Sequence, residues 1–482
     1  MKPESKLLET SFEKMKKHYE VLEGKMGIEK LPEDCLIQIF KNLPIADRTR
    51  IERVNKKFQE EAKRSWSNIK ELNIDPKFLG LKPFGREHQY PLEYPEIDKF
   101  SLEGILKRCG RYLKKIDLSR IYSCALSVVA EYCVSIESIK CCLASQKGLI
   151  QLKDNCKKIC ELIVDNEVKD EDAIGDLFSV NRNLRVLDIQ NYAVSGKCLL
   201  KLPLEEMLVL KLPGCETSIL SNAIKKTNQL SEFCAFIYSS SIITDLASSC
   251  SNLTVIDLIK DYDSDIGNVD FQFSQVFKKN KNLKSIKLDR FEFNGECLLS
   301  LNKNSIEQVF LTEINNIEGD YLINSLPHCV KLDTLYFLNF KQDVLDKVLE
   351  SISLCSNLKT LTLDFLRNFS HDNLIKSLSS SKNIESLTFN YVKEESIKRG
   401  LFSFISSSLL NLKYLSFHSS GIFDNDLEPL HNLLNLEEID ISYNGSITGS
   451  VLVKFPGLKK LHCFSCNNLE DDNLINFMKC AT

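Results

Sequence analysis

The side chains best suited to chemistry in this 482-residue chain are its 18 cysteines and seven histidines. Thiolates and imidazoles bind zinc when about four of them converge on one point, and either can serve as a nucleophile or base. Six of the cysteines instead stand three or four residues before copies of a recurring apolar motif: Cys109, Cys133, Cys156, Cys250, Cys329 and Cys355. Thiols that recur once per repeat predict a column of small buried residues, not a metal cage. We therefore expect no metal site and no cofactor.

Motifs typical of catalysis and of nucleotide binding are missing from the sequence. It contains no G-x-G-x-x-G, no phosphate-binding loop that ends in Gly-Lys-Ser/Thr, no H-E-x-x-H and no G-x-S-x-G. The histidines are scattered, and none lies in a recognisable nucleophile motif. These observations favour a non-catalytic protein over an enzyme.

The composition indicates an ordinary soluble globular protein, with 43% hydrophobic residues, 27% charged residues and a formal net charge of −4. Domains that bind nucleic acid usually carry a basic excess, and a bilayer span needs roughly 18 consecutive apolar residues. Because neither feature is present, we expect no nucleic acid and no membrane as partner. Residues 1–27 lack the apolar core of a secretion signal, so we expect reduced cysteines and a cytoplasmic or nuclear location.

One apolar motif, L-x-x-L-x-L with occasional Ile, Val, Met, Phe or Cys, recurs along most of the chain, at starts 22 to 30 residues apart. Its 15 copies begin at Leu113, Ile136, Ile159, Leu184, Met207, Leu230, Leu253, Leu283, Ile306, Leu332, Leu358, Ile384, Leu412, Leu436 and Leu458. A sixteenth candidate begins at Ile69. This period predicts leucine-rich repeats, in which each copy forms a short strand and the following residues return as a helix.

The predicted fold is therefore α/β, a solenoid over residues 69–482 with parallel strands on its concave face and helices on its convex face. Segments 343–355 and 371–381 have the apolar spacing of three and four that predicts two of these helices. Residues 75–100 are rich in proline and predict an insertion or loop among the repeats. Residues 1–27 have apolar residues three to five apart, which predicts an amphipathic helical extension.

Residues 28–68 follow a different pattern, with two short helical stripes of apolar residues. The first stripe is Leu36, Ile39, Phe40 and Leu43, and the second is Ile51, Val54, Phe58 and Ala62. Asp47 is the candidate N-cap of the second helix. About 40 residues is near the lower limit for independent folding, so we expect the stripes to remain uncovered and to dock on the repeats or on a second protein.

This segment resembles an F-box, a short all-α domain whose pattern runs Leu-Pro, Leu, Ile-Phe, Leu and later Val with a following aromatic residue. The resemblance implies that an adaptor protein is bound by Leu31, Pro32, Leu36, Ile39, Phe40, Leu43, Pro44, Ile51, Val54 and Phe58. Asn55 and Phe58 stand where the family usually has Cys or Ser and Trp, respectively. With cysteine-containing repeats behind this segment, the chain is similar to the F-box/leucine-rich-repeat family.

The resemblance implies a substrate-recognition subunit of an SCF-type cullin–RING ubiquitin ligase. The F-box would bind the S-phase-kinase-associated adaptor protein, through which it would reach the cullin–RING core. The repeats would hold a target protein for ubiquitination. A leucine-rich-repeat scaffold or inhibitor that acts without ubiquitin transfer is the alternative, because it would share the same repeats.

The concave positions of the later repeats carry aromatic and histidine side chains suited to protein recognition. The predicted substrate-binding residues are Phe310, Tyr336, Tyr414, His418, His462 and Phe464. The same pattern is equally compatible with ordinary strand residues partly covered by their neighbours. Only Lys140, Lys211 and Lys287 occupy the central concave column, which disfavours a phosphate-containing ligand.

Overall fold

The structure is a computed structural model and describes residues 27–74, 99–119, 125–168, 170–189, 194–212, 214–314, 316–365, 371–392, 399–455 and 457–480. The predicted helical extension at 1–27 and the predicted insertion at 75–100 lie almost entirely outside these residues. The chain forms two compact units, which divide between Asn181 and Arg182. Each unit is described by itself.

The first unit begins with a helical domain, residues 28–68, made of five short segments. These are η1 (Ile28–Lys30), α2 (Glu33–Lys41), α3 (Ile45–Ile51), α4 (Lys56–Ser65) and η2 (Trp66–Asn68). The side chain of Asn55 caps α4, because its Oδ1 accepts a hydrogen bond from the Phe58 N–H at 2.8 Å. Asp47 lies inside α3, so the prediction that it caps the second helix is wrong. The domain contains three α-helices where the sequence pattern indicated two.

Four strands among the described residues of the first unit follow this domain and pair in parallel, in chain order. They are β1 (Glu71–Asn73), β2 (Lys115–Leu118), β3 (Ser138–Ala144) and β4 (Glu161–Val168). The helical segments between and after them are α5 (Lys99–Cys109), η3 (Gly110–Tyr112), α6 (Ala125–Tyr132), α7 (Gln146–Asn155) and α8 (Glu171–Val180). The sixteenth motif candidate, at Ile69, therefore contributes β1 to the sheet.

The second unit continues the same pattern with twelve strands among its described residues, again parallel and paired in chain order. They are β5 (Val186–Ile189), β6 (Val209–Leu212), β7 (Glu232–Ile237), β8 (Val255–Lys260), β9 (Ser285–Asp289), β10 (Gln308–Thr312), β11 (Thr334–Leu338), β12 (Thr360–Asp364), β13 (Ser386–Thr388), β14 (Tyr414–Ser416), β15 (Glu438–Asp440) and β16 (Lys460–His462). Each of the predicted motif copies thus supplies one strand.

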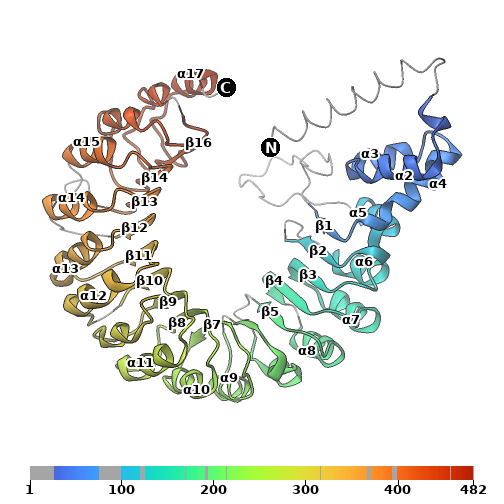
Figure 1. The fold of residues 1–482 in the computed structure, drawn as a ribbon, viewed down its shortest axis with the longest axis horizontal. Helices are drawn as coiled ribbons and strands as arrows, with labels where there is room; N and C mark the ends of the chain where they lie inside the picture. Colours follow the sequence, from blue (N-terminus) through green and yellow to red (C-terminus); the bar gives the residue numbers. More distant parts are fainter. Residues whose placement is uncertain are drawn as a thin grey trace. The chain divides into compact units, whose positions relative to one another are not determined.

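Helical segments connect these strands and lie on the outer side of the second unit (Figure 1). They are η4 (Lys197–Lys201), η5 (Leu204–Glu206), α9 (Thr217–Ile224), α10 (Ser241–Ser249), α11 (Asp270–Lys279), η6 (Glu296–Ser300), α12 (Gly319–Ser325), η7 (Leu326–His328), α13 (Gln342–Ser353), α14 (His371–Ser379), α15 (Arg399–Ser408), α16 (Asp424–Leu427), η9 (Glu428–Asn432), η10 (Leu452–Lys454) and α17 (Asp471–Cys480). The two helices predicted at 343–355 and 371–381 are α13 and α14. The predicted leucine-rich-repeat fold is confirmed.

The core of each repeat is built from the apolar residues of its motif. The middle residue of each motif lies opposite the middle residue of the next, as Leu335, Leu361 and Leu387 do on β11 to β13. These three side chains are fully buried, and burial of one leucine stabilises a fold by about 1.5–3 kcal/mol. Because no single repeat can cover its own apolar face, stacking in this register is what makes each repeat stable.

The six cysteines that precede the motifs are buried, as the sequence pattern predicts. Burial raises the pKa of the Cys355 thiol to about 12 and that of Cys329 to about 11. The Cys355 thiol donates a hydrogen bond to the Ser351 carbonyl at 3.2 Å. These thiols therefore serve as packing residues with backbone partners. No group of three or more His, Cys, Asp or Glu among the described residues could hold a metal ion.

Two asparagines occupy the cysteine position in their own repeats and bond to the backbone there. The Oδ1 of Asn280 accepts a hydrogen bond from the Leu253 N–H at 2.8 Å, and its Nδ2 donates to the Cys250 carbonyl at 3.2 Å. Asn181 makes the same two kinds of contact in the first unit. Both side chains are buried. A polar group is stable there because it satisfies backbone groups that would otherwise lack partners.

We expect the substitution Asn280→Ala to lower the free energy of unfolding by about 1–3 kcal/mol, because it leaves a buried N–H and a buried carbonyl without partners. Urea denaturation measures this loss, and hydrogen exchange at the Leu253 amide should accelerate. Asn282→Ala, at an exposed position two residues further on, is the matched control and should change little. Equal stability of the two variants would contradict the bridging role.

A thiol reagent at pH 8 should modify Cys35 well before Cys355. Cys35 is exposed on α2, whereas Cys355 is buried and its raised pKa leaves even less thiolate at that pH than an ordinary cysteine has. Mass spectrometry of digested samples over time measures both rates. Cys35→Ser should remove the fast modification of this peptide, and rapid labelling of Cys355 in the folded protein would count against its burial.

Candidate protein-interaction sites

The apolar stripe of the helical domain forms a core of its own. Leu36, Phe40, Phe58 and Ala62 are buried against one another, with the rings of Phe40 and Phe58 edge to face at 5.3 Å between centroids. The expectation that these stripes remain uncovered is therefore wrong for these four residues. The turn before α4 allows that helix to pack back on α2, so each helix covers the apolar face of the other.

Seven of the ten predicted adaptor-binding residues remain accessible on this domain. Leu31, Ile39, Leu43 and Ile51 pack against the core but are only partly buried, and the exposed members are Pro32, Pro44 and Val54. Val54 lies between α3 and α4 and is 62% exposed. Leu36, Phe40 and Phe58 can contribute to a partner surface only indirectly, by holding these residues in place.

A buried arginine fastens the three helices together. The guanidinium of Arg48 donates hydrogen bonds to the carbonyl oxygens of Leu43 at 3.0 Å and Ser65 at 3.1 Å, and to the Asn68 Oδ1 at 2.8 Å. It also donates to the Lys41 carbonyl at 2.5 Å. Burial lowers the pKa of this guanidinium from its usual value. Five donors in one plane suit a site where helix ends leave several carbonyls without partners. Sequence periodicity gave no signal for this residue.

A second polar cluster joins the helical domain to the first repeat helix within the same unit. The indole Nε1 of Trp66 donates to the Glu52 Oε1 at 2.8 Å, and the Arg108 Nε of α5 lies 2.7 Å from the other carboxylate oxygen. The Arg48 guanidinium lies 5.6 Å from the centre of the Trp66 ring. Glu52 and Trp66 are buried. Exposed residues such as Val54 are thus carried on a domain fixed to its neighbour by charged hydrogen bonds.

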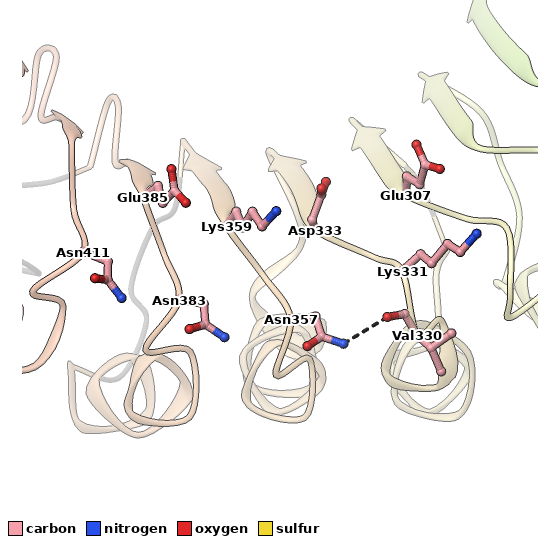
Figure 2. Close-up of a pocket in the computed structure, with 9 residues that line it drawn as sticks. All are labelled: Glu307, Val330, Lys331, Asp333, Asn357, Lys359, Asn383, Glu385 and Asn411. Atoms are coloured by element: carbon pink, nitrogen blue, oxygen red, sulfur yellow. Dashed lines mark hydrogen bonds between the residues drawn. The ribbon is translucent and has the colours of Figure 1, made fainter.

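In the second unit, a shallow depression of about 600 Å³ lies along the edge where β10 to β14 begin (Figure 2). Its charged lining residues are Glu307, Lys331, Asp333, Lys359 and Glu385, which follow one another along successive repeats. Asparagines in the same depression bond back to the preceding repeat, as Asn357 does to the Val330 carbonyl at 2.9 Å. Asn383 and Asn411 make the same kind of contact, so the asparagines of this depression link neighbouring repeats.

The six predicted substrate-binding residues fall into separate groups on the strands. Phe310 and Tyr336 lie opposite each other on β10 and β11, with ring centroids 5.9 Å apart. Burial raises the pKa of Tyr414, which is half-buried on β14. His462, on β16, lies with its Nε2 2.9 Å from a carboxylate oxygen of Glu438. The structure therefore does not bring all six together in one site.

His418 and Phe464, the remaining two, belong to a longer row of rings that we call the aromatic strip. Its members are Phe365, Tyr391, His418, Tyr443 and Phe464, and successive ring centroids are 4.2, 5.2, 4.8 and 5.8 Å apart. The Oη of Tyr391 is also 3.2 Å from the His418 Nε2. The row crosses from β12 to β16, one ring from each repeat.

Sequence reasoning missed Phe365, Tyr391 and Tyr443, because they lie just beyond the strand positions that were considered. Each stands at position 8 of its repeat when the first motif residue is counted as position 1. This shared position is the signal that could have identified them. Among the described residues no helix is both long and apolar enough to cross a lipid bilayer.

Comparison with known families decides what the helical domain is. Residues 28–71 match the family model described as F-box-like, a stretch that contains the helical domain and β1. The helical domain is F-box-like, and leucine-rich repeats follow it in the chain. The F-box accounts for the three helices with their own core, and the repeats account for the parallel strands behind them.

A relative of one part of the chain is EEED8.10 of Caenorhabditis elegans, which is named as a candidate RNA-binding protein. It is 29% identical over 121 residues, which make up 24% of this chain and 15% of that protein. The match therefore spans only a small part of the relative.

Similar solved structures include two bacterial proteins. The internalin inlF of Listeria monocytogenes is 14% identical, with a TM-score of 0.35, and the overlap covers 86% of this chain and 99% of that chain. The leucine-rich-repeat protein LIC12759 of Leptospira interrogans is 14% identical, with a TM-score of 0.36, and covers 87% and 96%. The fold is assigned from the parallel strand register of this chain and not from these similarities.

The link between the F-box and α5 can be tested through Trp66, which is the single tryptophan of the chain. We expect Arg108→Ala to destabilise the F-box by about 1–3 kcal/mol, because it leaves the buried Glu52 carboxylate without its charged partner. Denaturant titration followed by tryptophan fluorescence measures this change. Lys107→Ala, which removes the ion pair between an exposed lysine and Glu103, is the control. A shift of equal size in the control would refute a specific role for Arg108.

Proposed function

We propose that this protein is the substrate-recognition subunit of an SCF-type cullin–RING ubiquitin ligase. An F-box in front of leucine-rich repeats supports a protein-interaction role. The observation that carries the finer proposal is the accessible apolar set of the F-box, with Val54, Pro32 and Pro44 exposed and Ile39 and Leu43 half-buried. These residues face solvent although the domain has its own core, so they are available to the S-phase-kinase-associated adaptor protein.

The chain's contribution would be positional. The F-box would dock on the adaptor, and the repeats would hold a target protein near a ubiquitin-charged enzyme brought by the cullin–RING core. Holding two reactants close together raises their effective concentration and needs no catalytic group on this chain. We propose that this takes place in the cytoplasm or nucleus.

The hydrogen bonds and the ion pair made by Glu52 and Arg48 are consistent with a positioning role. A receptor can hold its target at a defined place relative to the adaptor only if the docking domain keeps a fixed orientation on the adjoining repeats. The Arg108–Glu52–Trp66 contacts join the F-box to α5 in the first unit. The Asn55 cap also keeps the turn beside Val54 ordered, so the departure from the usual family residue preserves helix capping.

We expect Val54→Glu to weaken co-purification with the adaptor and cullin by about tenfold or more, because a charge would be buried in an apolar contact. Leu200→Glu is the matched control, since Leu200 is also 62% exposed and lies in the second unit. Pull-down of the full-length chain from cells, with quantitative detection of adaptor and cullin, measures the difference.

Two results would contradict the proposal. Undiminished recovery of the adaptor with Val54→Glu would remove this surface from the contact. Failure of the unmodified chain to recover adaptor and cullin would favour the alternative, a leucine-rich-repeat scaffold or inhibitor that acts without ubiquitin transfer.

Leu36→Ala should abolish adaptor binding by a different route. Leu36 is fully buried, so its truncation should destabilise the small F-box core by about 2–5 kcal/mol. Tryptophan emission should then shift to longer wavelength at lower denaturant concentration, whereas Val54→Glu should leave the emission unchanged. Loss of binding with a native fluorescence profile would instead indicate that Leu36 contacts the adaptor directly.

A further inference from the structure

The aromatic strip is held in place by the backbone as well as by ring contacts. The Tyr391 N–H donates to the His418 carbonyl at 2.9 Å, and the Tyr443 N–H donates to the Phe464 carbonyl at 2.7 Å. Each repeat in this region is thereby tied to the next at the point where the strip residue leaves the strand. The rings form a surface of fixed spacing, close to the separation of neighbouring strands.

Three residues of the strip have backbone dihedral angles in the left-handed region. The φ angles of Phe365, Tyr391 and Tyr443 are +54°, +55° and +60°. This conformation costs a bulky residue about 1–2 kcal/mol, whereas asparagine adopts it readily. Asn339 occupies the same repeat position with a φ of +56°. The same left-handed backbone recurs at this position from β9 to β16, so it belongs to the repeats. In three repeats of the strip it carries a large ring where a small polar side chain would fit the backbone better.

The rings are accessible although they contact one another. Tyr391 is 42% exposed, Tyr443 is 50% exposed and Phe464 is 65% exposed. Exposed aromatic surface on consecutive repeats is what a protein partner uses as an anchor. Such a strip could also stack nucleic-acid bases, so its charge has to decide between these partners.

The described strand positions beside the strip carry carboxylates and no lysine or arginine. From β10 to β16, these are positions 5, 7 and 8 of the repeats. They contain three carboxylates, of which Glu313 and Asp440 are half-buried and Asp364 is buried. At position 3, Lys460 is paired with Glu438 at 2.8 Å. A nucleic-acid site needs basic residues to neutralise phosphates. This surface instead complements a cationic partner.

An arginine of the chain already stacks on an aromatic ring next to this column of residues. Arg290 stands at position 8 of its own repeat, also with a positive φ, and its guanidinium lies 3.9 Å from the centre of the exposed Tyr262 ring. Arginine stacks on aromatic faces as a plane, which the ammonium group of lysine cannot do. The same column of the solenoid thus already contains one guanidinium–ring pair.

We propose that the aromatic strip binds an extended, arginine-containing segment of a protein. Guanidinium groups would stack on Tyr391, Tyr443 and Phe464, and the carboxylate of Asp440, whose side chain is 20% exposed, would balance their charge. Identification of that segment as part of a ubiquitination target rests on the function proposed above; the binding itself does not.

The test measures binding of fluorescent peptides to the purified full-length chain by anisotropy. We expect an arginine–serine repeat peptide to bind, and a lysine–serine peptide of the same length and charge to bind several-fold more weakly. The double variant Tyr391→Asn/Tyr443→Asn should weaken arginine-peptide binding by about tenfold or more. Asparagine suits the left-handed backbone, so this variant should keep its fold.

Three controls accompany this measurement. Tyr391→Phe keeps the ring and should retain binding, and Phe271→Ala removes an exposed ring of α11, away from the strip, and should have no effect. Val54→Glu should bind the peptide normally, and the double variant should still recover the adaptor, so failure of one proposal is distinguishable from failure of the other.

Each of three outcomes would overturn the proposal. The first is unchanged binding by the double variant. The second is equal binding of the arginine and lysine peptides, which would show that net charge alone is recognised. The third is tight binding of single-stranded polyuridine that competes with the arginine peptide, which would assign the strip to nucleic acid.

Discussion

Parallel pairing of apolar residues in one register is the constraint on which the repeats depend. Once Leu361 lies opposite Leu335 and Leu387, every other position of those repeats is aligned with its counterparts as well. Buried thiols, bracing asparagines and surface rings therefore form continuous rows without any further interaction to align them. A feature repeated in the sequence becomes a feature of one surface, because the strands leave no freedom to shift.

The F-box is stabilised differently, because its apolar residues are covered by its own helices and not by a neighbouring repeat. Its apolar core contains four buried residues, and hydrogen bonds of buried polar side chains add to the contacts between its helices. The guanidinium of Arg48 satisfies carbonyls at the ends of two helices, and Glu52 connects Trp66 to Arg108. Such bonds fix direction more strictly than apolar packing does, so they hold the F-box in a set orientation against α5.

The repeat period in the sequence was sufficient to predict the strands, α13 and α14, because burial in a solenoid follows directly from position in the repeat. It was insufficient for the F-box. Periodicity identifies the apolar face of a helix but not what covers it, so Leu36 and Phe40 were expected to stay uncovered. The predicted cap at Asp47 failed because the chain turns again at Asn55. Phe365 and Tyr443 were missed because their direction depends on a backbone angle that no apolar pattern reports.

The left-handed position at the end of these strands has a consequence for how such proteins diverge. From β9 to β16 it holds Arg290, Glu313, Asn339, Phe365, Tyr391, Ser419, Tyr443 and Ser465, all with positive φ. The array keeps the same backbone whether this residue is charged, small or aromatic. Substitutions at this position can therefore change the surface of one repeat while the backbone of the array stays the same.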